Sequence, residues 1–511
     1  MTLDETADPR AAARPRGHPR RWATLAVLCT SLLLVGVDLT VLHVAVPSIT
    51  RHLMPEAAEL LWIVDVYSLT VAALLVTFGT LGDRLGRKRM LSAGFAVFGT
   101  ASAAAAFSGT AAQLIGARML LGVGAAMIMA STVAVIRSVF PDARERAVAI
   151  GLWTAAHSVG ATIGPLVGGA LVERWWWGAV FLVNVPVVAV VLVAGHRLVP
   201  ESRDPAPRRW DARGAVLSIA GLALAVYALK RLGGDGAVVT AVLGTAGIAL
   251  LAAFVVRQRR ASQPLLDLSL FADRRFRVAT LGVLGCFGCY TALLFFLTQW
   301  LQLVAGHSPV STGLMLAPLA AANAAGAVAA PWLAGRTGHR VAVTASLAVF
   351  AAALAVLAGG TGAPVAVLVA VLVTSGAGAG VVMTLGADII MSAARPERAG
   401  EAAAIQETSF ELGAGLGIAV LGTALAATYR AVLPAVPGLR PEEGAAARES
   451  LGAATAVAAR LDHANAAILL RAARNAFDQG FTVVMGIAAV VLVATSVLSA
   501  VLLRGGARRG A

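Results

Sequence analysis

Two oppositely charged side chains lie deep inside long apolar runs of the sequence. Asp38 and Arg118 each fall roughly 10–15 Å from the end of their runs at 1.5 Å per helical residue. An ionisable group inside a membrane span is energetically costly. Its presence there despite this cost makes each residue a functional candidate. A carboxylate that alternates between a proton and an arginine partner would couple proton entry to a conformational change. A static structural ion pair is the alternative.

Two glutamates in another apolar run form a second acidic site. Glu407 and Glu411 are four residues apart and therefore share one face of a helix. Like charges this close in a low-dielectric site cannot both ionise easily, so we expect at least one to hold a proton near neutral pH. Such a pair suits proton exchange or neutralisation of a cationic substrate. A passive position in a water-filled vestibule is the alternative.

Asp65 is a weaker candidate for the same chemistry. It lies near the predicted outer end of its apolar run, where an interfacial carboxylate costs little. A role in proton or substrate handling and a purely structural role are equally open for this residue.

The runs that hold these residues are long enough to cross a bilayer. The chain has 511 residues, of which 58% are hydrophobic and only 13% are charged. Long runs without polar alternation argue against a β-barrel, so we predict an all-α polytopic membrane protein. Fourteen transmembrane helices are expected at residues 23–49, 59–79, 90–108, 112–136, 147–172, 178–198, 213–230, 237–256, 278–303, 312–333, 341–358, 364–391, 400–428 and 481–503.

The net charge of +14 is distributed so that it orients the chain in a membrane. Most lysines and arginines fall in alternate loops, which is the positive-inside pattern. This places both termini in the cytoplasm and argues against a nucleic-acid partner. The expected partners are the lipid bilayer, protons and a small-molecule substrate, and the chain is expected to act as a monomer.

A glycine-punctuated basic loop joins the second and third predicted helices. It reads GTLGDRLGRKRML from Gly79 to Leu91. Its charges border a helix end, where they can interact with the helix dipole and with neighbouring loops. The candidate residues of this loop are Gly79, Gly82, Asp83, Arg84, Gly86, Arg87 and Lys88.

The fifth predicted helix carries a glycine motif. Gly160, Gly164 and Gly168 recur every fourth residue and form a smooth face that another helix can approach closely. Pro165 removes a backbone donor and permits a local bend, and Gly169 extends the motif.

Two stretches of the first half of the chain are repeated later in the sequence. Residues 335–340 are a worn copy of the basic loop, and Glu397–Ala399 echoes Glu145–Ala147, in each case eight helices later. Two six-helix halves with two inserted helices explain this displacement. The predicted parts are an N-terminal tail (1–22), a six-helix bundle (23–198), two inserted helices with their loops (199–277), a second six-helix bundle (278–503) that includes an extracellular loop (429–480), and a C-terminal tail (504–511).

Together these motifs resemble the major facilitator superfamily, specifically its fourteen-helix drug:proton antiporter branch. The resemblance rests on the basic loop and on three helical motifs in the expected places. These are Arg118–Gly124, Gly160–Gly169, and Val37–Pro47 together with Trp62–Tyr67. It implies the major facilitator fold, a latch at the basic loop that breaks and remakes, and a seam near the fifth helix that resists proton leak. Asn323 departs from family members that carry an acid in its region, which implies a preference for monovalent cations or neutral amphiphiles.

The sequence therefore predicts a proton-coupled antiporter in the bacterial cytoplasmic membrane that exports amphipathic, cationic drugs or antibiotics. A dedicated exporter of one endogenous metabolite or antibiotic is the first alternative, and a non-transporting membrane sensor or scaffold is the second. We expect no enzyme activity, cofactor or metal, and the chain has no G-x-x-x-x-G-K-[ST] pattern for ATP.

Overall fold

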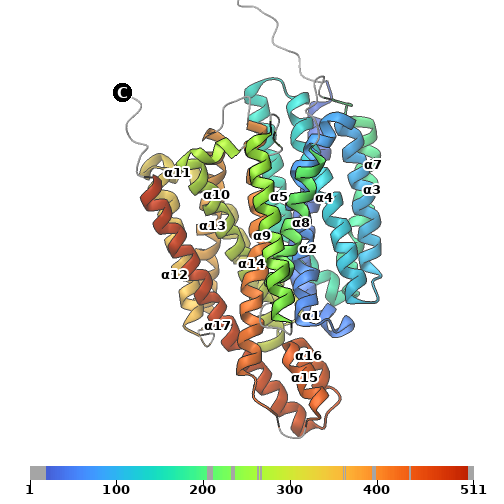
Figure 1. Cartoon of the computed structure of the whole chain (residues 1–511), viewed down its shortest axis with the longest axis vertical. Coiled ribbons are helices and arrows are strands. Elements are labelled where there is room, and N and C mark those ends of the chain that lie inside the picture. The colour runs from blue at the N-terminus through green and yellow to red at the C-terminus, as the bar shows by residue number, and fades with distance from the viewer. Residues whose placement is uncertain are drawn as a thin grey trace, which may run out of the picture.

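The structure is a computed structural model, and it describes residues 19–203, 211–231, 236–261, 264, 268–360, 362, 364–393, 399–436 and 439–503. Within these ranges all regular secondary structure is helical (Figure 1). The predicted tail residues 1–18 and 504–511 and the echo at residues 397 and 398 lie outside the described part of the chain.

Most of the predicted spans appear as long apolar helices. In the described residues, 13 helical segments are long and apolar enough to cross a membrane. They comprise α1 (Arg21–Leu53), α2 (Ala57–Leu85), α4 (Ala111–Val139), α5 (Ala143–Arg174), α6 with α7 (Ala179–Leu182 and Asn184–Leu198), α8 (Ala212–Lys230), α9 (Ala237–Arg260), α10 with η2 (Arg274–Gln299 and Trp300–Val304), α11 (Pro309–Thr337), α12 (His339–Ala358), α13 (Val365–Ala393), α14 (Ala399–Val432) and α17 (His463–Leu502). The predicted all-α membrane fold is confirmed.

Helix α3 (Arg87–Ala106) corresponds to the third predicted span, residues 90–108. It packs beside α4 and α7 but is not among the 13 apolar segments. Its first three residues are Arg87, Lys88 and Arg89, and alanine dominates its last turns. The count of fourteen spans therefore stays a prediction.

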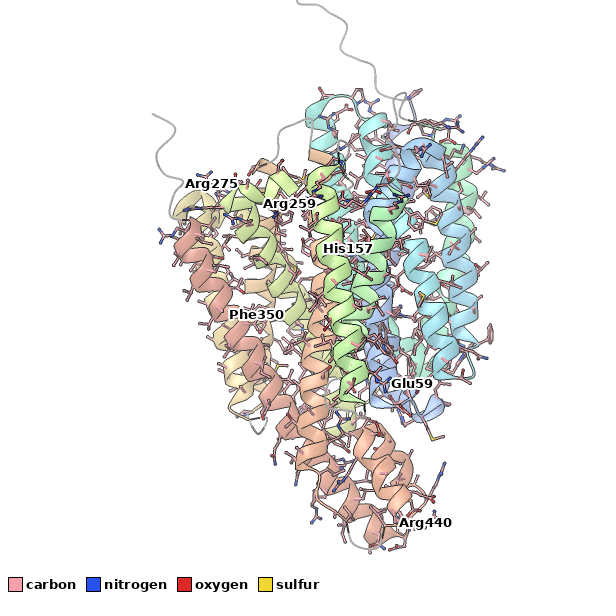
Figure 2. All side chains as sticks on the ribbon, in the orientation of Figure 1. Glu59, His157, Arg259, Arg275, Phe350 and Arg440 are labelled. Atoms are coloured by element: carbon pink, nitrogen blue, oxygen red, sulfur yellow. The ribbon has the colours of Figure 1, made fainter. Side chains whose placement is uncertain are left out.

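The surface of the bundle has the polarity of a membrane protein. Large apolar side chains point outward along the helices, with Val328 83% exposed and Val238 78% exposed. Charged residues gather toward the ends, where Arg259 and Arg275 lie at one end and Arg440 lies at the other (Figure 2). An apolar belt between charged ends matches the hydrocarbon core of a bilayer between its headgroup layers.

The two sets of helices lie side by side. Helices α1 to α7 form one side of the molecule in Figure 1, α10 to α14 and α17 form the other, and α8 and α9 lie in front. Both sides use the same local devices. Gly86 between α2 and α3 has a φ of 111°, and Gly338 between α11 and α12 has a φ of 80°, values that side chains rarely allow. The turn at the basic loop therefore recurs in the second set of helices.

Contacts between the two sides gather toward the end of the bundle where α1 finishes and α2 begins. The Gln302 side chain donates a hydrogen bond to the Val44 carbonyl (3.0 Å). The Val310 amide donates to the Glu173 carboxylate (3.2 Å). A Cβ on Gly415 would lie 2.7 Å from the Leu69 side chain. We call this end the closed end and the boundary between the two sides the seam.

Two short helices cover the closed end. Helices α15 (Pro441–Glu449) and α16 (Leu451–Ala458) fall in the predicted extracellular loop and extend past the other helices (Figure 1). Helix α16 packs on α1, where Gly452 contacts Thr50. The Tyr429 hydroxyl at the end of α14 donates a hydrogen bond to the Ala447 carbonyl (3.0 Å). The loop is thus docked on the bundle.

Candidate functional site

Asp38 and Arg118 form an ion pair in the interior of the first set of helices. The Arg118 Nη1 atom lies 2.9 Å from Asp38 Oδ2, and both side chains are almost completely buried. The pair joins α1 to α4. Because removing one partner would leave a buried charge uncompensated, the two side chains are strongly interdependent.

Polar groups from two further helices complete this pair. The Asn184 side-chain amide of α7 donates to the other Asp38 oxygen (2.9 Å) and to the Ser102 hydroxyl of α3 (3.2 Å). Sequence reasoning missed Asn184, although an amide inside an apolar run was a usable signal. Asp38 is therefore contacted on both oxygens.

Arg118 also holds the backbone of α2. Its Nε atom donates to the Ile63 carbonyl (3.2 Å), and its Nη2 atom donates to the Val64 carbonyl (3.3 Å). The guanidinium carbon lies 4.6 Å from the centre of the Tyr67 ring. A change in the charge of Asp38 would therefore alter the position of Arg118 and, with it, the hydrogen bonds that Arg118 donates to α2.

The same stretch of α2 contacts the second set of helices. The side chains of Ser68 in α2 and Glu411 in α14 interact across the seam, and both residues are buried. Glu411 Oε2 is buried without a hydrogen-bond partner in the described part of the chain. Glu407, one turn earlier in α14, is half-buried. Of the two predicted glutamates, Glu411 thus faces the seam directly.

Asp65 is not the interfacial carboxylate that the sequence suggested. Its side chain is fully buried and lies 2.6 Å from the Nζ atom of Lys230 in α8. The physical reason is that α8 packs against α2 and covers this position with a matching charge. Sequence reasoning missed Lys230 because a lysine at the last residue of a predicted span resembles an interfacial anchor.

The basic loop contacts its own side of the molecule. Arg87 pairs with Asp83 (2.8 Å) and donates to the Ala134 carbonyl. Lys88 donates through Nζ to the His196 carbonyl (2.7 Å), and its amide donates to Glu201. The loop therefore contacts α4, the last turn of α7 and the segment after α7. A latch between the two sides stays a prediction for another conformation.

The glycine motif of α5 divides between two neighbours. A Cβ on Gly164 would contact Thr40, and one on Gly168 would lie 2.8 Å from the Val41 carbonyl oxygen, so these glycines face α1 on the same side of the seam. Gly160 likewise faces Leu33. The expected seam role of these three glycines is therefore not seen here, because α1 occupies their face.

The seam contact of this motif comes from its other two members. A Cβ on Gly169 would lie 2.6 Å from the Pro309 carbonyl oxygen of α11, and the Pro165 carbonyl oxygen lies 2.8 Å from where a Cβ on Gly313 would stand. Asn323 of α11 faces α13 on its own side, where its amide approaches the Gly376 carbonyl (3.5 Å).

Comparisons with known proteins agree with this architecture. A family model described as Major Facilitator Superfamily matches residues 28–418. The chain is 43% identical over 495 residues to the multidrug efflux pump LfrA of Mycolicibacterium smegmatis, covering 96% of this chain and 97% of that one. It is 38% identical over 485 residues to the methyl viologen resistance protein SmvA of Salmonella typhimurium, covering 94% and 97%.

A solved structure shows the same fold. The crystal structure of a bacterial homologue of the human lysosomal transporter Spinster, in an inward-facing and unoccupied conformation, matches with a TM-score of 0.66. It is 17% identical and covers 94% of this chain and 98% of that one, so the likeness concerns the fold alone. The chain belongs to the major facilitator superfamily, and it is a multi-pass membrane transporter related to the multidrug efflux pumps of that family.

Proposed function

We propose that this protein exports amphipathic cationic drugs across the cytoplasmic membrane in exchange for protons. The observation that carries the proposal is the buried Asp38–Arg118 ion pair and its extension to the seam through α2. A buried carboxylate next to an arginine can exchange that partner for a proton, because protonation removes the attraction between the two charges.

The contacts of α2 give a physical route from protonation to movement. Arg118 holds α2 at the carbonyls of Ile63 and Val64, and Ser68 of the same helix meets Glu411 of α14. When Asp38 takes a proton, Arg118 loses its counter-ion. Its hydrogen bonds to the backbone carbonyls of α2 would then rearrange. The resulting shift of α2 would break the Ser68–Glu411 contact at the seam, and the closed end would open.

Glu411 and Glu407 are the proposed recognition site for a cationic substrate. Both acids lie on α14, Glu411 is at the seam, and one of its oxygens has no partner within the described residues. A cation entering from the end opposite the closed end would become the partner that this oxygen lacks. The name of the methyl viologen resistance relative supports a cationic substrate, since methyl viologen is a dication.

The closed end is proposed to face outward, with both termini in the cytoplasm. Arg259 and Arg275 lie at the opposite end (Figure 2), as the positive-inside rule requires of the cytoplasmic side. A closed outer end in this orientation would correspond to an inward-facing conformation.

Transport into inverted membrane vesicles tests the proposal. A monovalent cationic dye should accumulate when the vesicle interior is acidic, and the accumulation should collapse when an ionophore removes the pH gradient. A panel of unrelated cations and neutral amphiphiles should compete with the dye if the pump is broad. The absence of pH-dependent uptake across the whole panel would reject proton-coupled drug export.

A further inference from the structure

The inserted helix α8 contributes a buried charge to the seam. Lys230, its last residue, lies with Nζ 2.6 Å from Asp65 Oδ1 of α2, and both side chains are at most 1% exposed. Asp65 Oδ2 is also buried and lacks a hydrogen-bond partner within the described residues. One oxygen of the Asp65 carboxylate is therefore paired with Lys230 of α8, and the other has no hydrogen-bond partner among the described residues.

An aromatic ring forms the other wall of the lysine site. The Lys230 Nζ atom lies 3.5 Å from the centre of the Trp62 ring, one turn before Asp65 in α2. The ring of Tyr227 in α8 lies 6.3 Å from that of Trp62. A carboxylate beside an aromatic face is the arrangement that recognises an ammonium group, and it is strongest when water is excluded. Here the ammonium is supplied by the chain itself.

This cation subsite, formed by Asp65 and Trp62, lies at the seam. Leu69 of α2, Val226 of α8 and Ala419 of α14 form one apolar cluster around it. Asp65 and Ser68 are three residues apart, so the subsite and the Ser68–Glu411 contact are separated by roughly one helical turn, about 5 Å along α2. The subsite therefore lies about one helical turn along α2 from the residue that interacts with Glu411.

We propose that Lys230 is a tethered cation that occupies a substrate subsite formed by Asp65 and Trp62, so that the inserted helix α8 limits the cationic charge that the transporter accepts. This inference rests on the proposed export of cations. While Lys230 is in place, Asp65 is already neutralised, and only the glutamates of α14 are open to a substrate. Without the lysine amine, Asp65 and Trp62 would accept a second cationic centre.

A static structural role for the pair makes a different prediction. If the pair only fastens α8 to α2, removing the amine lowers thermal stability and leaves the relative affinities of different cations unchanged. Substrate selectivity therefore separates the two roles, whereas loss of stability alone does not.

The experiment measures binding of two probes to the purified full-length protein in lipid nanodiscs at neutral pH. The monocation is tetraphenylphosphonium and the dication is methyl viologen. The variants are Lys230→Met, Lys230→Arg, and Lys230→Met combined with Asp65→Asn. Lys230→Gln replaces the methionine variant in both places if that variant does not fold, as judged by thermal unfolding.

The affinity for the dication relative to the monocation should rise about tenfold or more in Lys230→Met, as expected for a desolvated carboxylate and aromatic ring that gain a cation. It should stay at the wild-type value in Lys230→Arg, which keeps the site filled, and return to that value in the double variant. An unchanged ratio in folded Lys230→Met, or an equal rise in the double variant, would overturn the inference. If the wild type binds neither probe, the failure lies with the proposed function.

Discussion

At the scale of single residues, Asp38 is the most constrained acid of the site. Arg118 contacts one of its oxygens and Asn184 contacts the other. We expect Asp38→Asn to abolish uptake driven by a pH gradient, because an amide keeps the shape of the side chain but cannot exchange a proton. The variant also leaves Arg118 uncompensated, and breaking a buried pair costs about 3–5 kcal/mol of stability.

A double variant separates these two effects. Asp38→Asn combined with Arg118→Gln removes both charges, so thermal stability should recover toward the wild-type value while pH-driven uptake stays absent. Stability is measured by thermal unfolding in detergent and uptake in inverted vesicles. Coupled transport by either variant would show that Asp38 does not carry the proton.

The two glutamates of α14 should respond differently to neutralisation. Glu411 is buried at the seam and interacts with Ser68, whereas Glu407 is half-buried. We expect Glu411→Gln to reduce pH-driven uptake of every substrate, and Glu407→Gln to change mainly which cations compete with the dye. Competition assays with both variants, each at matched protein levels, measure this. The same competition profile for both would contradict the assignment.

At the scale of helices, close packing of α5 on α1 depends on Gly164. A Cβ there would contact Thr40 and would lie 3.1 Å from the Val37 carbonyl oxygen. We expect Gly164→Ala to cost about 1–3 kcal/mol, typical of overpacking. Gly79→Ala is the matched control, because nothing lies within 4 Å of its Cβ position and alanine favours a helix. Thermal unfolding compares the two, and equal destabilisation would argue against the contact.

An ion pair between Asp211 and Arg257, which we call the charge lock, joins α8 to α9 at the end of their hairpin, outside the predicted membrane spans. Asp211 caps α8 by accepting from the Gly214 amide (3.0 Å), and Arg257 of α9 donates to both its oxygens (2.9 Å each). These hydrogen bonds, those from Arg257 above all, hold the pKa of Asp211 below its ordinary value. A lowered pKa means that the lock stabilises the hairpin above the unfolded-state pKa and is lost as the pH falls through the folded-state pKa.

Asp211→Asn tests this lock, since asparagine keeps the cap but not the charge. Hydrogen exchange in the first turn of α8 should be faster in the variant than in the wild type at neutral pH. The difference should shrink in acid, where the wild-type carboxyl is also neutral. A difference that persists unchanged at low pH would mean that charge is not what holds the hairpin.

At the scale of the whole molecule, the closed end is fastened across the seam by the loop helix α16. A Cβ on Gly452 would lie 3.1 Å from Thr50 Cβ, close to the roughly 3.5–4.5 Å that a disulfide needs. We expect Thr50→Cys with Gly452→Cys to form a disulfide that stops transport by preventing the closed end from opening. Cys29, Cys286 and Cys289 are replaced by alanine in this background, since all three are free thiols.

Reduction should restore transport in the double cysteine variant, and each single cysteine variant should transport with or without reductant. Full transport by the oxidised double variant, with the disulfide shown by mass spectrometry, would mean that α16 and α1 do not separate during the cycle.

The sequence by itself determined the class of the molecule and much of its site. Hydrophobic runs specify membrane helices because each backbone group must be paired inside the bilayer, and charges inside those runs marked Asp38, Arg118 and Glu411 as candidates. The sequence also suggested that Asp38 and Arg118 pair, which the structure shows, whereas the other contacts were decided only by the tertiary structure. Lys230 reaches Asp65 because α8 folds onto α2, and Gly164 faces α1 because that helix fills its groove. Such pairings depend on contacts between residues far apart in the chain, and helix periodicity carries no information about which helix lies opposite.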